Sequence, residues 1–285
     1  MPELPEVETV VRELREGSEG RGPSVVGQTI TGVTVRWPRH IALPSPRELK
    51  RRLPGQKIES VSRRGKYLVF NLTRDVLLIH LKMSGDLLVV NGDSPRDKHA
   101  HTIFHFRNGH SLRFNDTRKF GKVFLVGRAE EVVGRLGLEP LERGFTAKSL
   151  GEMLAAKHRQ LKPLLLDQTF IAGLGNIYTD EALHLARLHP LRRSDTLKPD
   201  EVRALWRGIR RALQTGLRHN GASIDWVYRG GGFQDYFRAY DRAGEPCFNC
   251  GTPIRRIVVG QRGTYFCPNC QKRTRSRMAR MGRFA

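Results

Sequence analysis

The sequence is poor in acidic residues. Of 285 residues only 28 are Asp or Glu, whereas 50 are Lys or Arg, so the formal net charge is +22. A surface this positive attracts polyanions and binds them in a salt-dependent way, which makes nucleic acid the leading class of partner. A membrane surface is the second class, but no segment has the pattern of a basic amphipathic helix of the interfacial kind.

Long apolar runs are absent as well. No stretch of 18 or more apolar residues occurs, and the first residues are charged rather than apolar. These absences argue against a membrane-spanning helix and a secretory signal peptide, so we expect no membrane partner and a cytoplasmic location. Hydrophobic residues make up 39% of the chain, so a globular core is feasible, and the length favours two domains over one.

Cysteine is confined to one short stretch near the C-terminus. Its four residues form two Cys-x2-Cys pairs that are separated by 16 residues. Two such pairs at this spacing are typical of a closed tetrahedral zinc site, with disulfide pairing as the alternative. The sequence therefore predicts one structural Zn²⁺, which leaves no open position for a substrate, on the ligands Cys247, Cys250, Cys267 and Cys270.

The first residues, Met1-Pro-Glu-Leu-Pro, permit two interpretations. If Met1 is removed, Pro2 becomes an N-terminal secondary amine, and an uncharged amine is a nucleophile that forms Schiff bases. Glu3 beside it can give or take a proton. The alternative is structural, because Pro2 and Pro5 also suit the start of a helix.

The rest of the chain changes its pattern twice. Apolar residues at helical spacing predict a helix over residues 3–16, and short alternating segments separated by turn residues predict a β-sandwich or barrel over 28–126. The strands are expected at 28–36, 57–63, 67–72, 76–81, 87–90, 102–107, 111–114 and 122–126. Helices are then expected at 147–157, 163–167, 178–186 and 199–219, with Gly221 just past the last of them.

These features together resemble the formamidopyrimidine-DNA glycosylase family over residues 2–271. The resemblance rests on the order and spacing of several motifs: Pro2–Thr9, Gly65–Tyr67, His80–Gly85, Asn115–Gly121, Gly173–Tyr178 and the four-cysteine finger. It implies a multi-domain α+β fold. The expected parts are an N-terminal catalytic helix with a β-sandwich (2–130), a helix–two-turns–helix DNA-binding domain (131–232) and a zinc-finger hairpin (233–271).

The resemblance also implies the chemistry of base-excision repair. Pro2 would attack C1′ of a damaged nucleotide and form a Schiff base, which permits β- and δ-elimination, with Glu3 as the acid. Lys66 matches a lysine that contacts phosphate and transfers protons, and Arg262 matches an arginine that grips phosphates at the lesion. Without the motifs, Lys66 and Arg262 would be read as surface charges.

Further residues match the family's contacts with DNA. A flipped nucleotide leaves a hole in the duplex that inserted side chains fill, and the matching trio is Met83, Arg118 and Phe120. Arg118 and Phe120, two residues apart, are expected on one face of one strand. For Met83 and Phe120 the alternative is a place in the core. Phosphate contacts are implied for His99, Lys157, Lys162, Asn176 and Arg262. Lys119 stands where the family usually has arginine, so only its charge carries over to DNA binding, and Arg118 can also reach the base opposite the lesion.

Two regions depart from the family pattern. Residues 221–232 look shorter than the family's loop that closes over a flipped 8-oxoguanine. Residues 272–285 form a basic tail without an acidic residue, which we expect to be disordered and able to touch phosphates.

The resemblance favours an enzyme that excises oxidised purines from duplex DNA and cleaves the strand at abasic sites. Two alternatives stay open. One is a glycosylase of the endonuclease VIII type, which removes oxidised pyrimidines, and the other is a non-catalytic binder of damaged DNA. We expect a monomer on DNA in a bacterial cytoplasm, associated with the nucleoid through that DNA.

Overall fold

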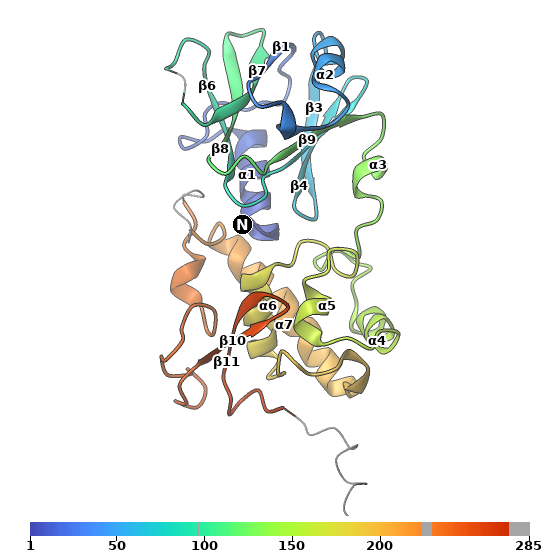
Figure 1. Cartoon of the computed structure of the whole chain (residues 1–285), viewed down its shortest axis with the longest axis vertical. Helices are drawn as coiled ribbons and strands as arrows, with labels where there is room; N and C mark the ends of the chain where they lie inside the picture. Colours follow the sequence, from blue (N-terminus) through green and yellow to red (C-terminus); the bar gives the residue numbers. More distant parts are fainter. Residues whose placement is uncertain (96, 224–229, 274–285) are drawn as a thin grey trace, which may run out of the picture. The chain divides into compact units, whose positions relative to one another are not determined.

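The structure, a computed structural model, describes residues 1–95, 97–223 and 230–273 (Figure 1). The described residues fall into two compact units, one from residues 1–137 and 215–235 and the other from 138–214 and 236–273. Predictions for the loop at 221–232 and for the basic tail fall largely on residues outside this description. Within the described ranges, no helix is both long enough and apolar enough to cross a membrane.

The first unit is built around its N-terminal helix, α1 (Leu4–Glu16). The four apolar side chains at helical spacing, Leu4, Val7, Val11 and Leu14, are all fully buried, as their spacing predicts. The helix packs against strands β3 and β4 (Ile58–Arg64 and Tyr67–Leu72). The start of the chain is therefore fixed to the sheets.

Two sheets form the predicted β-sandwich. One has the order β1-β7-β8-β6 and is antiparallel throughout, and the other has the order β2-β9-β5-β4-β3 with one parallel pair, β2 and β9. Side chains from α1 and from both sheets share one hydrophobic core. The remaining strands are β1 (Ile30–Val35), β2 (Ile41–Leu43), β5 (Val76–His80), β6 (Gly85–Asn91), β7 (Ala100–Phe106), β8 (His110–Asp116) and β9 (Lys122–Val126).

All eight expected strands are present, with ends shifted by a few residues. The sequence interpretation missed three short elements between β1 and β3, namely η1 (Pro38–His40), β2 and the helix α2 (Pro46–Arg52). It also missed α3 (Glu130–Val133). These elements bury few side chains, so they leave little periodicity in the sequence.

The second unit is mainly helical, as predicted. Its helices are α4 (Ala147–Ala155), α5 (Leu161–Leu165), α6 (Asn176–Leu185), the short η2 (Ser194–Thr196) and α7 (Pro199–Arg218), whose last turn belongs to the first unit, as does most of η3 (Phe233–Tyr236). A cysteine-rich segment follows with the hairpin β10 (Arg255–Val259) and β11 (Arg262–Phe266), which lies beside α6 (Figure 1). Gly260 and Gln261 form its turn with φ of 55° and 62°, the left-handed geometry of a tight hairpin.

Candidate active site and zinc centre

Pro2 and Glu3 lie at the start of α1, where both are buried. Glu3 is the N-cap residue and forms a reciprocal capping box with Glu6, whose Oε2 accepts the backbone N–H of Glu3 at 2.8 Å. The structure therefore holds the first residues in one conformation. The two residues that the resemblance assigns to nucleophile and acid are adjacent and oriented by the helix.

The second carboxylate oxygen of Glu6 connects the N-terminal end of α1 to the residues that follow α7. Glu6 Oε1 accepts the backbone N–H of Ala222 at 2.8 Å, and the Glu6 side chain is almost fully buried. Gly221 has a φ of +79°, and a Cβ atom there would come within 2.6 Å of Glu6 Oε1. Glycine is thus required at 221 both by the backbone conformation and by the close approach of the carboxylate.

The turn between β3 and β4 carries Lys66, whose side chain is buried. The preceding Arg63 donates to Glu8 Oε2 on α1 at 2.9 Å and to the carbonyl oxygen of Gly65 at 3.0 Å. The same arginine therefore holds the lysine turn to the helix that begins with Pro2 and Glu3. Arg64 anchors the turn from its other side, with bonds to the carbonyl oxygens of Leu136 and Gly137.

His80 lies on β5 beside this turn. Burial, together with the positive charges of Lys82 and Lys66, lowers the pKa of its imidazole to about 3. The ring is therefore neutral at physiological pH. Its Nδ1 accepts the backbone N–H of Lys82 at 2.9 Å, which fixes the start of the β5–β6 loop that carries Met83.

The three residues expected to fill the void in DNA lie on two loops of the first unit. Met83 is partly buried in the β5–β6 loop, while Arg118 and the half-exposed Phe120 lie between β8 and β9. The prediction that Arg118 and Phe120 share a strand is wrong, because β8 ends at Asp116 and β9 begins at Lys122. The intervening Lys119 has a left-handed backbone, φ 60°, which makes a turn.

The turn nevertheless brings these side chains together. The Arg118 guanidinium lies 5.2 Å from the centre of the Phe120 ring, and Phe120 is not in the core. Lys119 points to another aromatic group, with Nζ at 4.6 Å from the ring of Trp37. An exposed arginine stacked on an exposed phenylalanine is a suitable probe for insertion into a base stack.

Asp116 fastens both of these loops. It is fully buried and accepts bonds from Ser84 Oγ, from the Gly121 N–H at 2.6 Å and from the Arg118 N–H at 3.2 Å. The Nε2 atom of the equally buried His40 lies 3.4 Å from its Oδ2. Burial alone would raise the pKa of Asp116, but the interactions with His40, Ser84 and Gly121 outweigh it and lower the pKa to about 2.

In the second unit, two side chains that were expected to bind phosphate both donate hydrogen bonds to the carbonyl oxygen of Gly263. Lys162 Nζ donates to it at 2.9 Å and Asn176 Nδ2 at 3.0 Å. Lys162 is fully buried and also pairs with Asp180 at 2.7 Å, while Asp180 accepts the Tyr265 N–H at 2.9 Å. Burial raises the pKa of Asp180 to about 7, against the opposing pull of Lys162 and Tyr265. The three side chains thus clamp the strand on which Arg262 is exposed.

The remaining expected phosphate ligands are exposed or partly exposed. Lys157 follows α4 and is exposed, and His99 precedes β7 and is partly buried. The backbone of His99 joins the Asp116 network, because its carbonyl oxygen accepts the Asp116 N–H at 3.0 Å. Asp116 therefore supports His99 as well as the β5–β6 and β8–β9 loops that carry Met83, Arg118 and Phe120.

The four cysteines meet in one cluster in the zinc-finger segment. Their sulfur atoms all lie within 4.8 Å of one another, with Cys250 Sγ 3.5 Å from Cys267 Sγ and Cys247 Sγ 4.0 Å from Cys270 Sγ. Zn–S bonds of about 2.3 Å in a tetrahedron separate the sulfurs by about 3.8 Å, so the cluster fits one structural zinc ion. His184 on α6 supports it from outside, with Nε2 3.4 Å from Cys247 Sγ.

Sequence reasoning missed the buried carboxylates that support these groups. Glu6 and Asp116 lie inside motifs that carry the resemblance, and Asp180 lies two residues after the last glycine-rich motif. Glu181 beside it accepts the N–H groups of residues 238–240, which lead to the zinc finger. An acidic residue within a motif of so basic a chain is the signal that could have drawn attention to them.

Known protein families match three parts of the chain. Residues 1–123 match the model of the formamidopyrimidine-DNA glycosylase N-terminal domain, residues 136–227 match its H2TH domain, and residues 244–273 match the zinc finger found in FPG and IleRS. A formamidopyrimidine-DNA glycosylase from Pelotomaculum thermopropionicum is 45% identical over 95% of this chain and 99% of its own length.

Solved structures give the same result. One is MutM in complex with DNA containing carbocyclic 8-oxo-G, and another is the Lactococcus lactis Fpg with DNA containing an abasic site. Each has a TM-score of 0.87 and 38% sequence identity, and each comparison covers 95% of this chain and 100% of the solved one.

Proposed function

The chain belongs to the formamidopyrimidine-DNA glycosylase family, and from this premise we propose how its own residues excise a damaged base. The protein is a bifunctional DNA glycosylase and abasic-site lyase that removes oxidised purines from duplex DNA. Its place of action is the bacterial cytoplasm, on the DNA of the nucleoid. The observation that supports these roles best is the connection of α1 to the Lys66 turn through Glu8 and Arg63.

The nucleophile is the nitrogen of Pro2 after removal of Met1. An α-amino group has a pKa of about 7.7–8.0, so a useful fraction carries a free electron pair at neutral pH. That pair forms a bond to C1′, the bond from C1′ to the base breaks, and the base leaves. Glu3, fixed by its capping box, gives the proton that assists opening of the sugar ring, so that an iminium links Pro2 to the opened sugar.

Strand cleavage then follows from the iminium. It acidifies the neighbouring sugar hydrogens, so β-elimination breaks the bond to the 3′ phosphate and δ-elimination breaks the bond to the 5′ phosphate. Lys66 contacts phosphate and transfers protons in these steps. Arg262 binds the phosphates at the lesion, and Lys162 and Asn176 serve it by clamping the carbonyl of Gly263.

The attack requires that the nucleotide leave the base stack, which costs a few kcal/mol. Met83, Arg118 and Phe120 fill the space that it vacates, and Asp116 holds the two loops that carry them. His99, Lys119 and Lys157 bind phosphates, which positions the duplex without reading its sequence. A zinc ion on the four thiolates has no open position, so its contribution is to the fold of the finger.

A borohydride trapping experiment tests the nucleophile and the substrate together. The protein is mixed with a duplex carrying 8-oxoguanine opposite cytosine, and borohydride reduces the iminium to a stable protein–DNA crosslink. We expect a crosslink that peptide mass mapping assigns to Pro2, and that Pro2→Gly weakens. An uncleaved N-terminal tag should abolish it, whereas the same tag at the C-terminus, as the matched control, should leave it intact.

Other outcomes would change the assignment. A crosslink with thymine glycol but not with 8-oxoguanine would keep the mechanism and move the substrate to oxidised pyrimidines. No crosslink to any lesion, from protein that begins at Pro2 and binds DNA, would leave only a binder of damaged DNA.

A further inference from the structure

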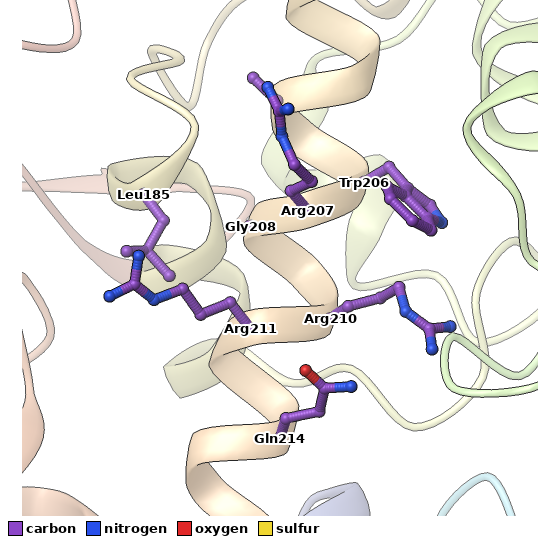
Figure 2. Close-up of a pocket in the computed structure, with 8 residues that line it drawn as sticks. Leu185, Trp206, Arg207, Gly208, Arg210, Arg211 and Gln214 are labelled. Carbon is purple, nitrogen blue, oxygen red and sulfur yellow. The ribbon is translucent and has the colours of Figure 1, made fainter.

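The second unit carries a basic hollow on α7 that the proposed chemistry does not use. It has a volume of about 500 Å³ and lies over the surface of α7, with Leu185 from the end of α6 at its side (Figure 2). No acidic residue of the described chain lines it. The charged and polar groups around it are Trp206, Arg207, Arg210, Arg211 and Gln214.

Four of the five arginines of α7 belong to the second unit, and these four are arranged on one side of the helix. An α-helix turns by about 100° per residue, so the four arginines fall within an arc of about 100°. The opposite side is apolar and buried, as at Leu205 and Ile209. The arginine face consists of Arg203, Arg207, Arg210 and Arg211, and all of them except Arg210 are exposed.

These exposed arginines lack partners within the described chain. Arg203, Arg207 and Arg211 form no ion pair with any residue in the described ranges, whereas Arg192 close by pairs with Glu201 at 2.9 Å. Like charges four residues apart on a helix repel each other, and each such pair destabilises it by roughly 0.2–0.5 kcal/mol. A bound polyanion would convert this repulsion into attraction.

The hollow is also well supported from below. A Cβ atom on Gly208 would lie 2.6 Å from the carbonyl oxygen of Ala182, so α6 and α7 are in close contact there. Trp206 Nε1 donates to the Phe145 carbonyl at 2.8 Å, and the Arg210 guanidinium lies 5.5 Å from the Trp206 ring centre. Arg210 also donates to the Pro140 carbonyl at 3.1 Å. The aromatic wall and one guanidinium are therefore held in place before any ligand binds.

The hollow is separate from the clamp at Gly263. Asn176, which bonds Gly263, is the first residue of α6, and Leu185, which borders the hollow, is the last. At 1.5 Å per residue, the two ends of this helix are about 14 Å apart. Phosphates bound at the two places would belong to different parts of a DNA backbone.

We propose that the arginine face of α7 binds the phosphodiester backbone of duplex DNA outside the lesion. The proposal rests on DNA as the substrate of this enzyme, and it adds a contact that undamaged DNA also makes. Guanidinium groups bind phosphate oxygens with two parallel hydrogen bonds, and such contacts are independent of sequence. Their effect is to raise affinity for undamaged DNA, on which a repair enzyme must search.

The salt dependence of DNA binding tests this proposal. The full-length triple variant Arg203→Gln, Arg207→Gln, Arg211→Gln is compared with wild type on a long undamaged duplex, with affinity measured over a range of salt concentrations. Each lost phosphate contact reduces the slope of log K against log salt by about 0.9, so we expect a reduction of about 2 to 3. Excision at saturating enzyme on a short lesion duplex should be unchanged.

A control variant removes the same charge elsewhere. Arg47, Lys50 and Lys57 are exposed, and their change to Gln should alter the slope by much less. An equal change in both triple variants would overturn the proposal, because net charge alone would then explain it. The proposal would also be overturned if the arginine triple variant kept the wild-type salt slope but bound poly-glutamate more weakly than wild type, because the face would then belong to an acidic protein partner. Failure of wild type to excise 8-oxoguanine would refute the proposed function but leave this comparison intact.

Discussion

Replacement of Asp116 by Asn tests whether one buried carboxylate supports the void-filling loops. The native side chain accepts Ser84 Oγ and the N–H groups of Arg118 and Gly121. An amide cannot accept all three in the same geometry, because one of its two ends is a donor. At least one buried N–H is then left without an acceptor, which costs about 1–3 kcal/mol.

The lowered pKa of Asp116 gives a second measure of the same support. A fall from 3.8 to about 2 corresponds to about 2 kcal/mol of preferential stabilisation of the carboxylate. Because the folded pKa lies below the unfolded one, this stability is present above pH 4 and is lost as the pH falls toward 2, with about half gone by pH 3. We therefore expect Asp116→Asn to lower the free energy of unfolding by about 2–4 kcal/mol at pH 7.

Two assays check this expectation. Urea unfolding of both proteins at pH 7 and at pH 3 should give a difference that shrinks at the lower pH, since the wild type loses its advantage there. Single-turnover excision of 8-oxoguanine should fall about tenfold or more, while cleavage at a preformed abasic site should fall less because less flipping is needed.

A neighbouring carboxylate provides the control. Asp86 is on β6 next to the same loop, but it pairs with Arg21, and within the described residues it forms no hydrogen bond with Met83, Arg118 or Phe120. Asp86→Asn should change stability without changing the ratio of excision to abasic-site cleavage. The reasoning is refuted if Asp116→Asn stays within about 0.5 kcal/mol of wild type at pH 7, or if the two variants change that ratio equally.

Three further predictions concern the other supports. Gly221→Ala should lower the free energy of unfolding by about 1–3 kcal/mol and reduce crosslinking to 8-oxoguanine DNA, since its Cβ would displace Glu6. Gly27→Ala, at a φ of +85° but in open space, should show only the smaller backbone effect, and thermal unfolding and borohydride trapping compare the two variants. Lys162→Met should destabilise by about 3–5 kcal/mol because it leaves Asp180 buried without its cation, and adding Asp180→Leu should recover part of the loss in urea unfolding; no recovery would contradict the ion-pair account. Wild type should release one zinc ion per chain in a colorimetric assay after thiol modification, and Cys250→Ser should release less zinc and lose strand cleavage. Full strand cleavage by zinc-free protein would contradict a role for the finger.

Local signals in the sequence were sufficient for most elements of the fold. The period of Leu4, Val7, Val11 and Leu14 predicted α1, and alternation between turn residues predicted the strands. The helix α2 was missed although Ser45 and Pro46 are a helix-start signal, because only Leu49 is buried in seven residues. Arg118 and Phe120 were misplaced because no glycine or proline marks the turn between them, and Lys119 takes the left-handed backbone that glycine would usually supply.

Candidate site residues could be named from the sequence only where a motif contains them. Pro2, Glu3, Lys66 and the cysteines came from motifs, whereas the partners of Asp116 or Asp180 depend on contacts between segments far apart in the sequence. Lys162 shows the limit most clearly. The family resemblance implied a phosphate contact for it, but its burial and its bonds to Asp180 and Gly263 can be seen only once α5, α6 and the hairpin are in place.

These supports share one chemical design that follows from the charge of the chain. Glu6, Asp116, Asp180 and Glu181 are all nearly or fully buried, and each accepts backbone N–H groups from a segment that carries or leads to site residues. Unpaired exposed carboxylates would repel DNA, whereas the charge of each of these carboxylates is offset locally by the N–H dipoles that point at it. These four acids of a +22 protein can therefore position its cations with little loss of their attraction for phosphate. It follows that changing one of these acids to its amide should reduce catalysis through lost geometry, while the affinity for undamaged DNA stays close to that of the wild type.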